Sequence, residues 1–251
     1  MIKLMLADIP VGIEERFDNI VKITDGYTTE KEPIFTVKVT DEELEEEKTI
    51  SGINASSGYF ESTVVYRHIA EIMPNYDAFL FHSSVIDCGE YAFVITANSG
   101  VGKTTHSRIW LSEFSGEVEI LNGDKPLVRF IDGAPYVFGT PWRGKEGYGK
   151  PGKKPLKAII FLERSKENYT KKIEPKEAVV RFMKQIYLPK RSPAMLAKTL
   201  SLANKLLLSV DLICLDAIRS LRQRTLQEPR FREALPKVKT NISKINFFAL
   251  T

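Results

Sequence analysis

The stretch ITANSGVGKTTHSRIW, residues 95–110, differs at one position from the phosphate-binding loop of many nucleotide-binding proteins. That loop follows the pattern G-x-x-x-x-G-K-[ST]. Gly102, Lys103 and Thr104 match the end of the pattern, whereas its first position is Ala97. Because alanine can replace glycine wherever φ is negative, the sequence predicts an altered entry to the loop and a retained phosphate cradle.

The segments on either side of the loop support this interpretation. The apolar run YAFVITA (91–97) is typical of a buried strand, and a helix is predicted from about Lys103 to Phe114. In such a strand–loop–helix unit, backbone N–H groups converge on a phosphate at the helix N-terminus. We therefore predict a nucleotide site here, in preference to an ordinary glycine-rich turn. The residues predicted to contact the nucleotide are Asn98, Ser99, Gly100, Val101, Gly102, Lys103, Thr104 and Thr105.

The chemistry of the loop also predicts a magnesium site. The lysine of this pattern neutralises the β- and γ-phosphates, and the following hydroxyl binds Mg²⁺. An acidic residue at the end of a neighbouring strand usually completes the metal site. Asp124, after the strand-like run VEIL (118–121), is the candidate, although Asn-Gly-Asp is also good turn chemistry. We therefore expect ATP and Mg²⁺ as cofactors, with Thr104 and Asp124 as metal ligands.

Strand-like and helix-like segments alternate along the chain, which predicts a mixed α/β fold. Strands are expected at 2–6, 19–23, 34–39, 78–86, 91–97, 118–121, 156–162 and 210–215, and a hairpin over 126–139. Helices are expected at 59–73, 103–114, 175–187, 192–208 and 215–226, and the acidic run 41–47 as a solvated loop or exposed helix. We predict a small β-rich N-terminal part (1–57) and a larger domain (58–251).

Composition and charge narrow the class of protein. The 251 residues are 43 % hydrophobic and 27 % charged, as in ordinary globular proteins. No apolar run approaches the roughly 18–20 residues of a membrane helix, and the first residues lack a signal-peptide layout. We therefore expect a cytoplasmic protein without a membrane partner. Cys88 and Cys214 have no metal-ligand spacing and are expected to be buried or inert thiols.

The net charge of +4 conceals an asymmetry between the two parts of the chain. Residues 1–100 carry 7 Lys and Arg against 18 Asp and Glu, whereas residues 101–251 carry 29 against 14. A basic half suits a phosphorylated ligand, or simply solvated helix faces balanced by the acidic half. No motif of a nucleic-acid-binding fold is present, so nucleic acid is not an expected partner.

A wider stretch resembles a known family. FHSSVIDCGEYAFVITANSGVGKTTHS (81–107) is similar to the P-loop region of the HPr kinase/phosphorylase family and of ATP- and GTP-dependent phosphoenolpyruvate carboxykinases. KTTHSRIW (103–110) and GTPWRGKEGYG (139–149) look like segments of small HPr-kinase-like proteins of Gram-positive bacteria. The resemblance covers about residues 78–162. It implies a P-loop kinase core built on a mixed sheet, of the HPr kinase C-terminal and carboxykinase type.

The resemblance also implies roles for single residues. Lys103 matches the phosphate-binding lysine, and Asp124 matches the second acid of an acidic pair, a metal ligand that can also act as a base. His82 matches a histidine beside the transferring phosphate or a second metal, with a core strand histidine as the alternative. The first acid of the pair is Gly123 in this chain, so the base is left open between Asp124 and His82.

The basic loop TPWRGKEGYGKPGKKP (140–155) is the remaining candidate region. Arg143 and Lys145 are expected to clamp the γ-phosphate or an acidic acceptor, the alternative being a mobile loop without a catalytic role. Trp142 is expected to pack. His106 is expected to be a surface or capping residue, and His68 a structural one.

The leading interpretation is an ATP- and Mg²⁺-dependent kinase that moves the γ-phosphate to a hydroxyl. The acceptor is either a serine of a protein or peptide, or a small hydroxylated metabolite. The alternative is a nucleotide-binding regulatory module with little or no catalysis, which Ala97 and Gly123 favour. A carboxykinase is the weakest hypothesis, because a chain of 251 residues leaves little room for a carboxylate-binding domain. Homo-oligomerisation and the role of the N-terminal part stay open.

Overall fold

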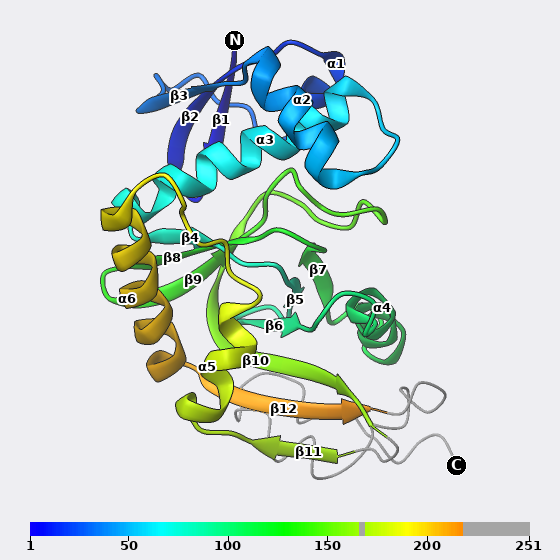
Figure 1. The fold of residues 1–251 in the computed structure, drawn as a ribbon. Helices are drawn as coiled ribbons and strands as arrows, with labels where there is room; N and C mark the ends of the chain where they lie inside the picture. Colours follow the sequence, from blue (N-terminus) through cyan, green and yellow to red (C-terminus); the bar gives the residue numbers. More distant parts are fainter. Residues whose placement is uncertain (166–168, 218–251) are drawn as a thin grey trace.

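The computed structural model describes residues 1–165 and 169–217, whose elements are arranged as in Figure 1. The N-terminal part has a three-stranded sheet, in which β1 and β2 are antiparallel and β2 and β3 parallel. Its strands are β1 (Ile2–Leu6), β2 (Ile9–Glu14) and β3 (Phe35–Lys38). Its helices are α1 (Asp18–Ile23), α2 (Asp41–Ser51) and α3 (Ser57–Ile72), followed by the 3₁₀ turn η1 (Met73–Tyr76).

Among the residues that the structure describes, the larger sheet has nine strands and combines parallel and antiparallel pairs. In spatial order its main path is β4 (Ala78–Leu80), β8 (Leu127–Ile131), β9 (Ala134–Phe138), β10 (Lys153–Arg164), β6 (Ala92–Thr96), β5 (Ser84–Asp87) and β7 (Glu119–Asn122). The long strand β10 pairs antiparallel with β9 and parallel with β6 and β12 (Asp211–Ala217), which in turn pairs with β11 (Tyr169–Lys172). The predicted mixed α/β fold is confirmed.

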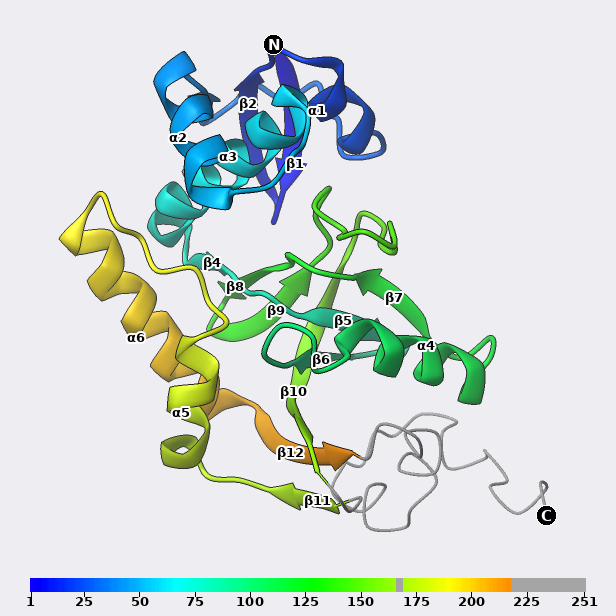
Figure 2. The ribbon, with the colours of Figure 1, turned by 45° about the vertical axis from the view of Figure 1, so that its right-hand side comes forward.

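Helices cover both faces of this sheet (Figures 1 and 2). On one face α4 (Lys103–Glu113) packs through Ile109 and Trp110 against Phe93 and Ile95 of β6. On the other face lie α5 (Pro175–Met183) and α6 (Pro193–Ser209), whose apolar residues pack with those of β6 and β10. Both sides of β6 are therefore buried, which fits its uninterrupted apolar sequence.

The N-terminal sheet and α3 share one apolar core, and this core reaches the larger domain. Leu4, Val11 and Val65 lie in the same cluster as Leu127 and Trp142. The helix α3, shown in cyan in Figure 1, lies between the small sheet and the large one. The predicted division at residues 57 and 58 stays a prediction, and α3 packs against both sides of it.

The structure corrects three predicted segments. Residues 19–23 form a helix, not a strand, because the Glu61 carboxylate accepts the N–H groups of Arg16 and Phe17 at 2.6 and 3.2 Å where α1 begins. The predicted strand 78–86 is interrupted at 81–83. Of the predicted helix 215–226, residues 215–217 belong to strand β12 and the others lie outside the described residues.

The acidic run 41–47 is part of helix α2, whose N-terminus is fixed by a capping box. The Thr40 hydroxyl accepts the N–H of Glu43, and the Glu43 carboxylate accepts the N–H of Thr40. Glu47 is only 5 % exposed, so the run is not uniformly solvated as predicted. No helix of the described chain is long and apolar enough to cross a membrane. Cys88 and Cys214 are buried free thiols, as predicted.

Candidate active site

The predicted site residues come together at one edge of the large sheet. β5 is antiparallel to both β6 and β7, so β6 and β7 run in the same direction and end at the same edge. The loop 97–102 follows β6, and Asp124 follows β7. His82 precedes β5 and therefore starts from this edge as well. The topology thus brings together three segments that the sequence separates by up to 42 positions.

The loop has the conformation that its two glycines allow. Gly100 has a φ of 75° and Gly102 a φ of 114°, and Gly102 is the N-cap of α4. Ala97 is not among the residues with positive φ, and its side chain is 6 % exposed in the core between the sheet and α4. A Cβ at position 97 therefore causes no backbone strain, so this backbone accepts alanine where the pattern has its first glycine.

Lys103 is folded back over the loop. Its ammonium donates a hydrogen bond to the carbonyl of Ala97 at 3.2 Å. Burial lowers the pKa of Lys103, and the opposing charge of Asp124 offsets this effect only in part. Asp124 is thus close enough to Lys103 for the two charges to interact, as expected if both act on one phosphate group.

Asp124 lies at the centre of a charged cluster that it forms with His82, Lys103 and Lys125. One of its carboxylate oxygens lies 3.1 Å from His82 Nε2 and 3.5 Å from Lys125 Nζ. Burial raises the pKa of Asp124, but the hydrogen bond with His82 and the charges of Lys125 and Lys103 outweigh it, so the pKa lies below its usual value. Asp124 is therefore ionised at neutral pH. An ionised carboxylate suits a metal ligand better than a strong base.

Residues that the sequence did not single out hold this cluster in place. The Asn122 amide oxygen accepts the N–H groups of Asp124 and Lys125, both at 2.9 Å, and its nitrogen donates to Thr140. Gln185, after α5, donates to the Asn98 side chain at 3.1 Å, and its carbonyl accepts the N–H of His82 at 2.7 Å. Buried Asn122 next to the predicted acid was the available signal; Gln185 had none, because it joins the site only through the fold.

The packing around position 123 explains why this residue is glycine. A Cβ at this position would lie 2.7 Å from the carbonyl oxygen of Arg143 and 3.1 Å from that of Tyr148. The loop that contains these residues crosses directly over the turn between Asn122 and Asp124. An acidic side chain at position 123 would displace that loop, so the missing first acid of the pair is tied to how this chain packs.

The basic loop passes next to Asp124 without bringing its charges onto it. A Cβ at Gly144 would lie 3.0 Å from the Cβ of Asp124. Arg143 donates to the carbonyl of Gly149 at 3.3 Å, within its own loop. Lys145 is exposed and has no hydrogen-bond or ion-pair partner among the residues that the structure describes. The proposed clamp by Arg143 and Lys145 therefore remains a prediction.

The predictions for Trp142 and His106 can be compared with the structure directly. Trp142 packs as predicted: it is 8 % exposed, and its Nε1 donates to the carbonyl and hydroxyl of Ser62 at 3.0 and 3.1 Å. The prediction for His106 is wrong, because this residue of α4 is fully buried and is not on the surface. Position 106 is one turn into α4, on the face that packs on the sheet.

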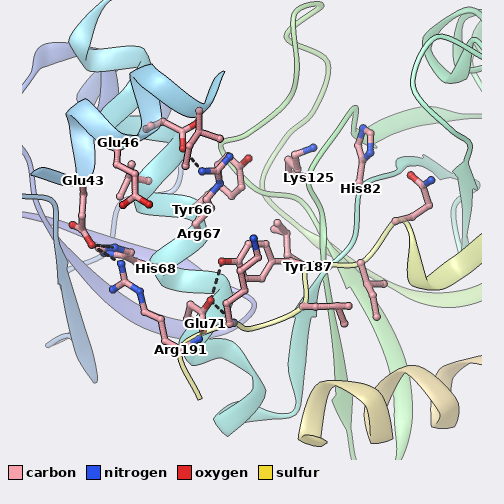
Figure 3. A pocket seen from close by; sticks show the side chains of 18 of the residues that line it. Glu43, Glu46, Tyr66, Arg67, His68, Glu71, His82, Lys125, Tyr187 and Arg191 are labelled. Carbon is pink, nitrogen blue, oxygen red and sulfur yellow. Dashed lines mark hydrogen bonds and ion pairs between the residues drawn. The ribbon is translucent and has the colours of Figure 1, made fainter. Parts of the chain in front are cut away.

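A cavity of about 550 Å³ opens next to the cluster, between the N-terminal part and the larger domain. His82, Lys125 and Gln185 line the end nearest Asp124. Figure 3 shows Lys125 and His82 at that end, and Glu43, His68 and Arg191 at the other. His68 Nε2 lies 2.8 Å from a Glu43 oxygen, which agrees with the predicted structural role of this histidine.

The donor set fits a magnesium ion only together with a nucleotide. The hydroxyl of Thr104 and the carboxylate of Asp124 are oxygen ligands of the kind that Mg²⁺ prefers. Within residues 1–165 and 169–217, no group of three or more His, Cys, Asp and Glu side chains is placed to hold a metal ion. A magnesium ion bound here would need phosphate oxygens to complete its coordination.

Comparison with known proteins gives little beyond this geometry. No family model matches the chain, and no curated protein matches it. Among solved structures, one similar chain is the Hpr(Ser) kinase/phosphatase from Coxiella burnetii, with a TM-score of 0.36 and 8 % identity, over 61 % of this chain and 97 % of that chain. These values are too low to assign a common function, so the residues of the site themselves must support one.

Proposed function

We propose that this protein is an ATP- and Mg²⁺-dependent phosphotransferase with a P-loop kinase core of the HPr kinase type, which transfers the γ-phosphate to a hydroxyl. The observation that carries the proposal is the meeting of loop 97–102, Lys103 and ionised Asp124 at one sheet edge. Each of these groups has a defined task in phosphoryl transfer, which depends mainly on positioning and charge neutralisation.

The backbone N–H groups at the N-terminus of α4 bind the phosphates, because the helix dipole and the free donors both favour an anion there. Lys103 exchanges the Ala97 carbonyl for a phosphate oxygen and neutralises its charge. Asp124 orients the acceptor hydroxyl, and His82 fixes the carboxylate through the 3.1 Å contact. Thr104 and Asp124 would hold a magnesium ion, which would supply further neutralisation of the phosphate charge.

Gly123 is compatible with this proposal. The transition state of phosphoryl transfer is loose, so the acceptor hydroxyl needs little deprotonation before attack. A general base contributes roughly 10²–10⁴-fold, which is a minor part of the total rate enhancement. Asp124, already ionised and fixed by His82, can accept the hydroxyl proton late in the step.

The test is transfer of label from γ-labelled ATP to components of a cell extract. We expect wild-type protein to label an acceptor, and Lys103→Ala and Asp124→Asn to abolish the labelling. Nucleotide binding with unchanged ADP in every acceptor pool would instead support the alternative, a nucleotide-binding regulatory module. If the protein bound no nucleotide in the presence of Mg²⁺, both functions would be excluded.

A further inference from the structure

The cavity next to Asp124 is the feature that this function does not yet use. Its volume of about 550 Å³ is in the range of small-molecule sites. One wall consists of α2 and α3 from the N-terminal part, and the other of residues 184–191, between α5 and α6. The end lined by His82, Lys125 and Gln185 lies next to the charged cluster around Asp124. A molecule in the cavity would thus have one end beside His82 and Lys125, which both contact Asp124.

The walls of the cavity are fixed by interactions among their own charged groups. Glu43 contacts His68 at 2.8 Å and Arg191 at 2.5 Å. Glu71 accepts the Tyr187 hydroxyl at 2.9 Å and the N–H groups of residues 190 and 191. Glu47 is paired with Arg67. These contacts join α2 and α3 to the segment 184–191, so the cavity is largely formed before a ligand enters.

Lys125 differs from these paired cations. Its only carboxylate contact within the described chain is with Asp124, at 3.5 Å, and Asp124 is shared with His82. An ammonium group has three donors, so Lys125 retains hydrogen-bonding capacity. The side chain of Lys125 is only 19 % exposed, so a second anion beside it would compensate the cost of burying its charge.

We propose that this cavity binds the phosphate acceptor, and that the acceptor is a small hydroxylated anion. Its carboxylate or phosphate group contacts Lys125 while its hydroxyl lies against Asp124. This inference rests on the proposed kinase function. In the step itself, the hydroxyl oxygen bonds to the γ-phosphorus, the bond from phosphorus to the bridging oxygen of ADP breaks, and Asp124 receives the hydroxyl proton.

The same distances limit the shape of the acceptor. Lys125 Nζ and the Asp124 oxygen are 3.5 Å apart, so one small molecule can reach both groups at once. A protein or peptide serine fits this arrangement less well. Peptides are usually recognised along strand edges or apolar grooves, whereas this cavity is lined by charged side chains that form ion pairs.

The first experiment separates the acceptor by size and charge. A cell extract is divided by ultrafiltration, and the filtrate is passed over a strong anion exchanger before incubation with the protein and γ-labelled ATP. We expect the labelled product only with the retained part of the filtrate. Labelling of macromolecules, or of the unretained part, overturns this inference and leaves the kinase function intact. Labelling of no fraction overturns both.

The second experiment assigns the role of Lys125. With the retained fraction as acceptor, Lys125→Met should raise the apparent KM for the acceptor by about 10- to 100-fold, the effect of losing a hydrogen bond to a charged group. The KM for ATP should not change, and Lys125→Arg should restore part of the affinity. Lys22→Met, an exposed lysine of α1, is the matched control. An equal rise in the KM for ATP, or no rise for the acceptor, overturns the assignment.

Discussion

The two ends of the cavity are built in different ways. At the catalytic end, the tips of β5, β6 and β7 place a loop and a single carboxylate, Asp124, in a fixed relation. At the far end, α2, α3 and the segment 184–191 form a wall of mutually paired charges. The catalytic end depends on a short, contiguous motif and on strand direction. The far end depends on residues 20 to 148 positions apart, which suits a region that selects the acceptor.

The largest expected effect is a loss of turnover when Asp124, at the catalytic end, is replaced. Asp124→Asn removes a charge that Lys103, His82 and Lys125 all face, and should lower kcat by about 10²–10³-fold, the effect of removing one electrostatic group from a transition state. ATP binding should persist, because the loop is unchanged. Steady-state kinetics with labelled ATP measures this, with Asp132→Asn in the exposed hairpin turn as the control. Unchanged turnover in Asp124→Asn would rule out the catalytic role.

The next effect is a loss of stability when the Arg67–Glu47 ion pair, in the wall at the far end of the cavity, is broken. Arg67→Ala leaves the Glu47 carboxylate, which is 5 % exposed, without its counter-charge. The free energy of unfolding should fall by about 2–3 kcal/mol, less than for a fully buried pair because Arg67 is 37 % exposed. Urea denaturation measures the change. Lys48→Ala, from an exposed pair on α2, the helix of Glu47, should cost less than about 1 kcal/mol. Equal costs for the two variants would show that the wall is not held by the Arg67–Glu47 pair.

A third effect concerns the turn between Asn122 and Asp124, at the catalytic end. Gly123→Ala should lower the free energy of unfolding by about 1–3 kcal/mol, because its Cβ would meet the Arg143 carbonyl at 2.7 Å. Thermal denaturation checks this against Gly89→Ala, where open space leaves only the strain of a positive φ. Gly123→Asp should be destabilised as well. A stable and faster Gly123→Asp would indicate that an ordinary acidic pair can be restored here.

The smallest effect is a shift in pH dependence. The hydrogen bond from His82 lowers the pKa of Asp124, so His82→Ala should raise it. Because Asp124 must be ionised to act, the acidic limb of the kcat/KM profile should move to higher pH. His68→Ala, at the far end of the cavity, should leave that limb in place. A shift in the opposite direction would contradict the assignment of this limb to Asp124.

The difference between the ends also explains what the sequence could predict. The loop, α4 and Asp124 follow from local patterns, because strand, glycine and helix signals lie next to one another. The helix at 18–23 and the burial of Glu47 depend on Glu61 and Arg67, which come from α3, so no local pattern reports them. Lys125 and Gln185 acquire meaning only when the fold brings them to one cavity.

The most direct test of the whole account is calorimetric titration of the full chain with ATP in the presence of Mg²⁺. Wild-type protein should bind at one site. Lys103→Ala should weaken binding by about 10- to 100-fold, since it removes a charged donor from the phosphates. Lys22→Ala should bind as the wild type does. Equal affinity in Lys103→Ala and wild type, or no binding by the wild type, would contradict the placement of the nucleotide on the loop after β6.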